Sequence, residues 1–177
     1  MRRNIFSRLN YNKYTEGSGV GGVTSSNRAA LKRRAAKTCY VNVKSGIRYI
    51  KVFFAPPTDG VIQISQLVVY SNGVNVARNG TASAANFLDP TVINKPIDGT
   101  LSVRDYPDIY HSTIPSNFGY WLLDLGEEFK VDQIVYYNRN NNEDRAIGML
   151  INTYDNSFSV QLNQFVLNDG LIQTFNL

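Results

Sequence analysis

The sequence has little of the chemistry that usually stabilises or activates a small protein: its 177 residues include one cysteine, one histidine and one tryptophan. Cys39 alone cannot form an intramolecular disulfide, and one cysteine with one histidine excludes the common Cys/His metal motifs. No apolar stretch is long enough to cross a bilayer, and no apolar run of secretory length follows Met1. We therefore expect a fold that depends on its apolar core, with no transmembrane segment and no secretory signal.

Candidate catalytic groups are also scarce. A Ser/His/Asp arrangement would have to be built around His111 without a Gly-x-Ser-x-Gly elbow, and a cysteine-based site would have to use Cys39. Glu127 and Glu128 follow a glycine, where we expect a solvated turn rather than an acid/base pair. The sequence therefore predicts a protein that is not an enzyme and that needs no cofactor.

Acidic residues are nearly absent from the first 40 positions, which contain nine of the 18 Lys and Arg residues but one of the 14 acids. The net charge of +4 thus separates into about +8 for residues 1–40 and about −4 for residues 41–177. Residues 17–26 are rich in Gly and Ser, and residues 27–37 are rich in Ala and Arg. We predict a basic N-terminal arm, 1–40, followed by one folded domain, 41–177.

The arm has two candidate partners. Its basic residues could neutralise about five phosphates without reading sequence, because no base-reading fold accompanies them. Its tyrosines and leucine also suit docking against other structural proteins of an assembly, which we favour, and a solubilising tail is the third alternative. The candidate arm residues are Tyr11, Tyr14, Arg28, Leu31, Lys32, Arg33, Arg34 and Lys37.

From residue 47 onward, short runs of β-branched and aromatic residues alternate with turn residues such as Asn72-Gly73. No helical periodicity of useful length accompanies them. We predict an all-β fold, an antiparallel β-sandwich or jelly roll, with Trp121 in the core rather than exposed as a stacking platform. The predicted strands are 47–54, 62–70, 75–78, 120–124, 133–138, 146–154, 157–167 and 171–175.

Six blocks of this region are similar, in their order, to those of the coagulation factor 5/8 type C, or discoidin-like, domain. They are ISQLVVY at 64–70, NVARNGTAS at 75–83, PIDG at 96–99, YWLLDLG at 120–126, VDQIVYYNR at 131–139 and DRAIG at 144–148. The resemblance covers residues 47–177 and implies a galactose-binding-like β-sandwich. The basic arm and Asn-rich linkers also resemble discoidin-like proteins that large double-stranded DNA viruses carry in their particles.

The resemblance implies a candidate glycan site at His111, Arg139 and Arg145. In fucose-binding members of the family, a loop histidine and two arginines converge on sugar hydroxyls, a role that suits the planar, multiply donating guanidinium group. Here Asn140-Asn141-Asn142 replaces the paired cysteines that those members have between the two arginines, and the spacing of the arginines is shorter by one residue.

A structural alternative stays open at two of these positions. Arg145 would pair with a carboxylate such as Asp98 or Asp124 inside the sandwich, and we give this pairing more weight than sugar contact. His111, in a loop rich in Tyr, Pro and Ser, would be a partly exposed loop residue.

The resemblance also raises calcium as a candidate ligand. Fucose-binding members hold it near an Asn-x-x-Asp-Gly-Asn pattern, of which this sequence keeps Asp98 and its glycine. Lys95 and Thr100 occupy the flanking ligand positions, and an ammonium group there repels a cation. Asp98 is therefore a weak metal candidate, and we expect no bound calcium.

Together, the arm and the resemblance favour a non-enzymatic structural or interaction protein. We expect a minor capsid protein, anchored in the virion by its arm and assembled in the host cell. The alternative is a carbohydrate-binding lectin module that uses His111, Arg139 and Arg145.

Overall fold

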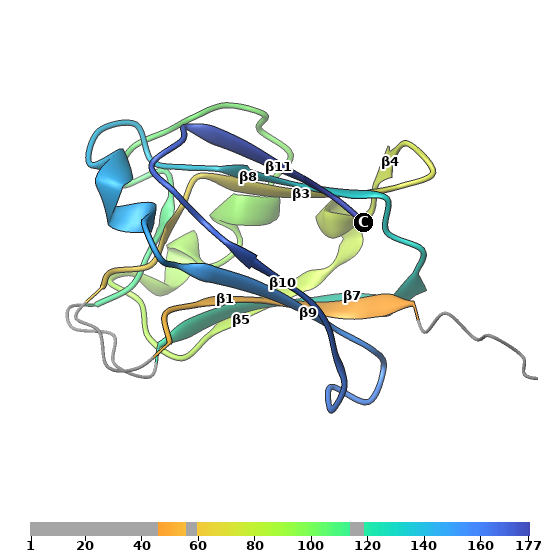
Figure 1. The fold of residues 1–177 in the computed structure, drawn as a ribbon. Helices are drawn as coiled ribbons and strands as arrows, with labels where there is room; N and C mark the ends of the chain where they lie inside the picture. The colour runs from red at the N-terminus through yellow and green to blue at the C-terminus, as the bar shows by residue number, and fades with distance from the viewer. Residues whose placement is uncertain (1–45, 56–59, 114–118) are drawn as a thin grey trace, which may run out of the picture. The chain divides into compact units, whose positions relative to one another are not determined.

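The computed structural model describes residues 46–55, 60–113 and 119–177, and these residues form mostly strands (Figure 1). The strands are β1 (Ile47–Phe53), β2 (Gln63–Ile64), β3 (Gln66–Ser71), β4 (Val74–Asn75), β5 (Thr81–Ala84), β6 (Tyr110–His111), β7 (Tyr120–Phe129), β8 (Gln133–Tyr137), β9 (Leu150–Tyr154), β10 (Gln161–Val166) and β11 (Ile172–Asn176). Short 3-10 helices are η1 (Val76–Asn79), η2 (Pro90–Val92), η3 (Lys95–Ile97) and η4 (Glu143–Ala146). The arm predicted for residues 1–40 lies outside the described residues.

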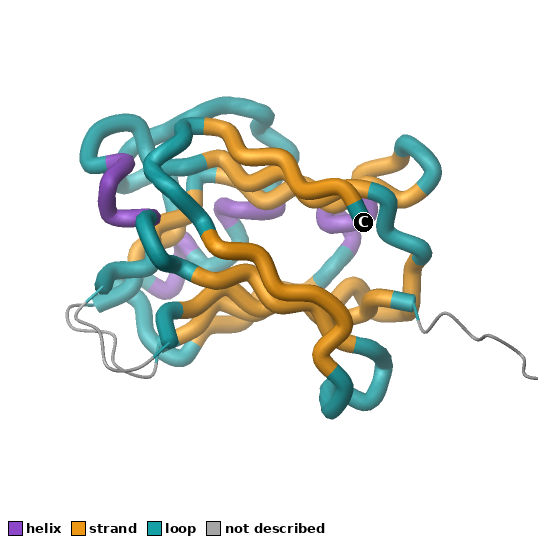
Figure 2. Tube along the Cα trace, in the orientation of Figure 1, coloured by secondary structure: helices purple, strands orange, loops and turns teal. Residues whose placement is uncertain are grey.

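Two antiparallel sheets face each other, as Figure 2 shows for the strands in orange. One sheet has the order β10-β9-β1-β7-β5, the other has the order β11-β8-β3-β4, and β2 pairs with β6 beside them. The prediction of an all-β protein built from antiparallel sheets is therefore confirmed for the described residues.

Strand β1 lies at the centre of the five-stranded sheet with β7 beside it, and the side chains of both strands alternate between the core and the surface. Ile50 and Val52 are fully buried. Between them, Lys51 places its ammonium over the rings of Phe53 and Tyr120, 4.8 and 5.1 Å from the ring centroids. An alternation of period two gives a strand one apolar face, and that face packs against the second sheet.

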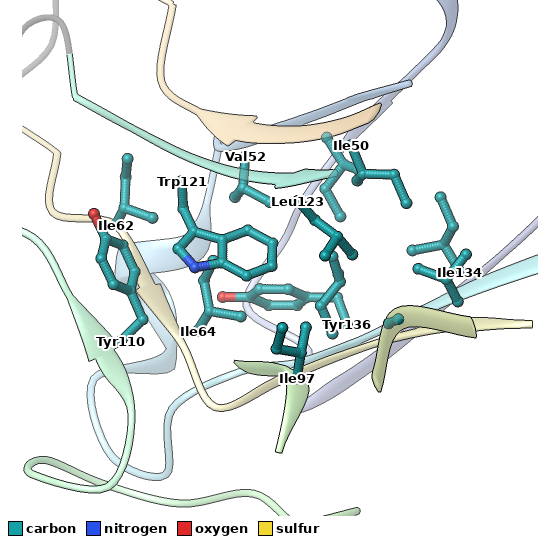
Figure 3. Packing of buried hydrophobic residues seen from close by; sticks show 14 of the residues in the cluster. Ile50, Val52, Ile62, Ile64, Ile97, Tyr110, Trp121, Leu123, Ile134 and Tyr136 are labelled. Carbon is teal, nitrogen blue, oxygen red and sulfur yellow. The ribbon is translucent and has the colours of Figure 1, made fainter. Parts of the chain in front are cut away.

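The core fills the space between the sheets. Figure 3 shows the side chains of Val52 (β1) and Trp121 (β7) on one side of the core and those of Ile64 (β2) and Tyr136 (β8) facing them from the other side. Trp121 is fully buried, and its indole N–H donates a hydrogen bond to the carbonyl of Ile93 at 2.9 Å. The prediction that Trp121 belongs to the core is confirmed.

The Asn72-Gly73 turn is also confirmed. Ser71 pairs with Val74 across a two-residue connection between β3 and β4. Asn72 and Gly73 have φ angles of 50° and 76°. A two-residue hairpin needs positive φ at both central positions, which Asn and Gly tolerate better than other residues.

Several details differ from the predicted elements. The strands predicted to start at 146 and 157 begin at Leu150 and Gln161, because η4 ends at Ala146 and a turn precedes β10. The predicted strand 75–78 is wrong, because the Asn75 side chain accepts a hydrogen bond from the backbone N–H of Ala77 and thereby caps η1. Glu127 and Glu128 lie in β7, exposed, and not in a turn. Strands β5 and β6 were not predicted, because small residues dominate the first and the second has only two residues.

Candidate functional site

The pairing of β2 with β6 brings Gln63 directly opposite His111. Both residues are buried, with 2% and 6% of their surface exposed. The backbone carbonyl of Gln63 accepts a hydrogen bond from the buried hydroxyl of Tyr136 at 2.6 Å, which ties this strand pair to β8. The expectation that His111 is a partly exposed loop residue is therefore wrong, because a non-local strand pairing covers it.

Arg139 follows β8 and is fixed by its backbone. It forms a parallel bridge with Arg104, and its N–H donates to the side-chain oxygen of Asn138 at 2.8 Å. Asn138 is itself buried and donates from Nδ2 to the carbonyl of Glu143 at 2.9 Å. Asn138 thus closes the loop that separates Arg139 from Arg145.

The asparagine run within this loop reverses the chain. Asn141 and Asn142 have φ angles of 73° and 58°, in the left-handed region that asparagine tolerates better than most residues. Asn142 leads directly into η4, which contains Arg145. The run of asparagines from 140 to 142 therefore brings Arg145 back beside Arg139.

Arg139, Arg145 and His111 converge on the side-chain amide of Gln63. When the amide oxygen faces them, Oε1 lies 2.8 Å from Nη1 of Arg139, 3.2 Å from Nη1 of Arg145 and 2.8 Å from Nε2 of His111. In the opposite orientation, the amide nitrogen takes the place of the oxygen and can donate to His111 Nε2 at 2.8 Å. The same nitrogen, which is a donor, then faces the N–H donors of Arg139 and Arg145. The two arginines therefore favour the orientation in which the oxygen faces them.

The protonation state of His111 determines whether its Nε2 can donate a hydrogen bond to the amide oxygen of Gln63. Nδ1 lies 2.7 Å from the carbonyl of Ser112, so Nδ1 holds a hydrogen. In the neutral ring, Nε2 is then an acceptor that faces the amide oxygen of Gln63, another acceptor. Burial lowers the pKa of His111, and the charges of Arg139 and Arg145 lower it further, against the opposing effects of the Ser112 carbonyl and Asp105. The neutral form is thus favoured, although it leaves this contact unsatisfied.

Asp105 is the carboxylate of the cluster. Its Oδ1 lies 2.5 Å from Nε of Arg139, and its Oδ2 accepts a hydrogen bond from Asn141 at 3.1 Å. Burial raises the pKa of Asp105, but hydrogen bonds from Asn141, the backbone of Tyr106 and Arg139 outweigh burial and leave the pKa below its ordinary value. Asp105 is therefore ionised at neutral pH and neutralises one of the two guanidinium groups.

Tyr106 provides an exposed aromatic surface beside the cluster. Its ring is edge-on to that of His111, with centroids 5.9 Å apart, and 48% of the residue is exposed. An exposed aromatic face next to several hydrogen-bond donors is a common arrangement for holding a ligand that has both apolar C–H faces and polar groups.

The prediction that Arg145 pairs with Asp98 or Asp124 is wrong. Asp98 lies 2.7 Å from Nη1 of Arg104, and Asp124 lies 2.8 Å from Nε of Arg48. The pairing of β1 with β7 placed Arg48 on Asp124, and a local loop placed Arg104 on Asp98. Arg145 forms no ion pair within the part of the chain that the structure describes.

The surroundings of Asp98 do not fit a calcium ion. One carboxylate oxygen accepts the backbone N–H of Thr100 at 2.8 Å, and the other accepts Arg104. Lys95 directs its ammonium toward Asp108 at 3.1 Å, while its carbonyl accepts from Arg104. A guanidinium group thus lies where a cation would bind. Across residues 46–55, 60–113 and 119–177, no three His, Cys, Asp or Glu side chains gather as metal ligands.

Sequence reasoning missed Gln63, Asp105 and Tyr106. Asp105 and Tyr106 precede His111 in the same loop and could have been noticed as a carboxylate and an aromatic residue near a candidate ligand. Gln63 gave no signal, since it is a single polar residue in an apolar stretch, and only the register of β2 with β6 places it opposite His111.

All candidate arm residues, from Tyr11 to Lys37, lie outside the described residues. Among the helices that the structure does describe, none has the length and apolar character needed to span a membrane.

Comparisons with known proteins identify no relative: no protein-family model, no curated protein and no solved structure matches this chain.

Proposed function

We propose that the folded domain is a discoidin-like carbohydrate-binding module whose site comprises His111, Arg139, Arg145 and Tyr106. The observation that supports this proposal is the convergence of Arg139, Arg145 and His111, from three separate segments, on the single amide of Gln63 beside an exposed aromatic ring. Planar, multiply donating groups suit neighbouring sugar hydroxyls, and an aromatic face suits the C–H face of a pyranose ring.

A glycan array probed with the full chain tests this proposal. The matched variants are Arg145→Gln, which removes an exposed site donor, and Lys130→Gln, which removes one positive charge before β8, at the end of that strand away from the site. Binding that Arg145→Gln abolishes and Lys130→Gln preserves supports the module. Binding that survives Arg145→Gln, or no binding at all, contradicts it.

We also propose that the basic segment 1–40 attaches this module to a particle, as a minor capsid protein of a large DNA virus. The support is the separation of charge along the sequence, with a strongly basic N-terminal segment preceding an acidic domain. The test is incorporation into particles by the full chain and by a chain that starts at residue 41. Equal incorporation of both chains would overturn this second proposal, and weaker retention of the full chain as salt rises would indicate nucleic acid as its partner.

A further inference from the structure

The site has more positive than negative charge. The cluster holds two guanidinium groups, from Arg139 and Arg145, and one carboxylate, Asp105, which forms an ion pair with Arg139 and not with Arg145. Arg145 shares a neutral amide oxygen with Arg139, and its remaining N–H groups have no partner within the described residues. Two like charges brought to one neutral acceptor repel each other, and an anion between them would relieve that repulsion.

The amide of Gln63 cannot satisfy all the donors around it. An amide oxygen has two lone pairs, while two guanidinium groups and, when protonated, the imidazolium of His111 approach it. If Arg145 donated to a ligand oxygen instead, two donors, Arg139 and protonated His111, would remain for the two lone pairs of the Gln63 oxygen. The cluster therefore lacks one charged acceptor, and the most exposed of its donors, Arg145, is the one with surplus N–H groups.

From this charge imbalance we infer that the module selects acidic sugars, with the ligand's carboxylate or sulfate group on Arg145 and its ring against Tyr106. This inference rests on the proposed carbohydrate-binding function and names its ligand class. An arginine can donate two parallel hydrogen bonds to a carboxylate or a sulfate, and charge-assisted bonds of this kind are stronger than bonds to hydroxyls.

An acidic ligand also completes the hydrogen bonding of His111. The charged groups that face its ring are Arg139, Arg145 and Asp105, and the Ser112 carbonyl holds Nδ1. A ligand anion offsets the two arginines, so that Nε2 can take up a proton and donate to Gln63. Binding therefore takes up a proton, and affinity for an acidic sugar increases as pH falls through the range in which His111 titrates.

The test uses matched pairs of probes on the full chain at a fixed, physiological salt concentration. The pairs are sialylated glycans and the same glycans without sialic acid, glucuronides and the corresponding glucosides, and sulfated and unsulfated galactosides. The expected result is at least about tenfold tighter binding of the acidic member of a pair, which Arg145→Gln removes and Lys130→Gln preserves. The carboxylate and sulfate pairs distinguish the two sources of the anion.

A second variant supplies the missing charge within the protein. Gln63→Glu places a carboxylate where the neutral oxygen lies, so it should abolish the preference for acidic probes while Arg139 and Arg145 both remain. Its titration by NMR should show a raised pKa for His111, which also reports that the variant is folded.

The outcomes separate the two levels of the proposal. Equal binding of acidic and neutral probes, with both lost in Arg145→Gln, keeps the carbohydrate site and overturns the acidic preference. Acidic binding that Arg145→Gln leaves intact assigns the attraction to the basic arm and overturns the inference. An absence of site-dependent binding to every probe overturns the proposed function as well.

Discussion

Arg104 and Arg145 show how differently one protein can hold two arginines. Arg104 donates to Asp98, to the carbonyls of Ser65 and Lys95 and to the Gln66 side chain, and its side chain is 13% exposed. Arg145 is exposed and reaches one neutral oxygen that it shares with Arg139. Both lie in the same part of the fold, since Arg104 bridges to Arg139.

The difference shows that Arg104 has a structural role and that Arg145 is free to bind a ligand. An arginine whose donors end on a carboxylate and on backbone carbonyls joins segments of the fold, and removing it leaves those acceptors without partners. An arginine that faces a neutral, shared acceptor contributes little to folding and keeps donors for a ligand. Four substitutions or conditions test this contrast, and they are ordered by the expected change in the free energy of unfolding.

Arg104→Gln should have the largest effect. It leaves the partly buried Asp98 carboxylate and the carbonyl of Lys95 without their donor, so the free energy of unfolding should fall by about 2 to 4 kcal/mol. Urea unfolding followed by circular dichroism measures this change. A loss below about 0.5 kcal/mol would mean that water replaces the guanidinium group and that Arg104 is not structural.

Gln63→Glu should act in the opposite direction. A carboxylate here meets Arg139 and Arg145 together, and their attraction should exceed the cost of burying the new charge and raise the free energy of unfolding by about 1 kcal/mol. The same unfolding experiment applies, with Gln66→Glu as a control, since Gln66 faces Arg104, which already has a carboxylate. Destabilisation by Gln63→Glu would show that the cluster has no excess of positive charge.

Acid should weaken the fold through His111 by a smaller amount. Because burial and the two arginines lower its pKa in the folded protein, the unfolded chain binds more protons as pH falls below about 6.5. The free energy of unfolding should therefore decrease with falling pH in this window, before the carboxylates titrate. The wild-type chain and His111→Gln, compared by urea unfolding at several pH values, measure the effect, and identical slopes would contradict it.

Arg145→Gln should have the smallest effect on stability. It removes an exposed side chain that repels Arg139, so the free energy of unfolding should change by less than about 0.5 kcal/mol. Thermal unfolding at matched pH checks this expectation. A large loss would place Arg145 with Arg104 as a structural residue and remove the contrast between them.

Much of the fold could be predicted from local sequence pattern. The alternation in β1 and β7, the Asn72-Gly73 turn and the core position of Trp121 follow from backbone geometry and from the apolar character of a few neighbouring residues. The same reasoning failed where a side-chain hydrogen bond sets the backbone conformation. The side chain of Asn75 caps a 3-10 helix where a strand was predicted.

The site was less predictable. His111, Arg139 and Arg145 were predicted as a group from a resemblance, and the structure brings them together, but their partners depend on contacts between distant segments. The place of Gln63 could not be read from the chain, because it depends on the register of β2 with β6. Asp98 and Arg104 are only six residues apart, but their pairing depends on the path of the loop between them, for which the sequence has no pattern.

The sequence by itself determined the separation of charge, the scarcity of cysteine and histidine, and the alternation that makes antiparallel sheets, because these are properties of composition or of neighbours along the chain. Only the tertiary structure decided which arginine meets which carboxylate. Strand register, which joins positions dozens of residues apart, placed Arg48 on Asp124, and the path of the loop after η3 placed Arg104 on Asp98. Arg145 was left beside a neutral amide.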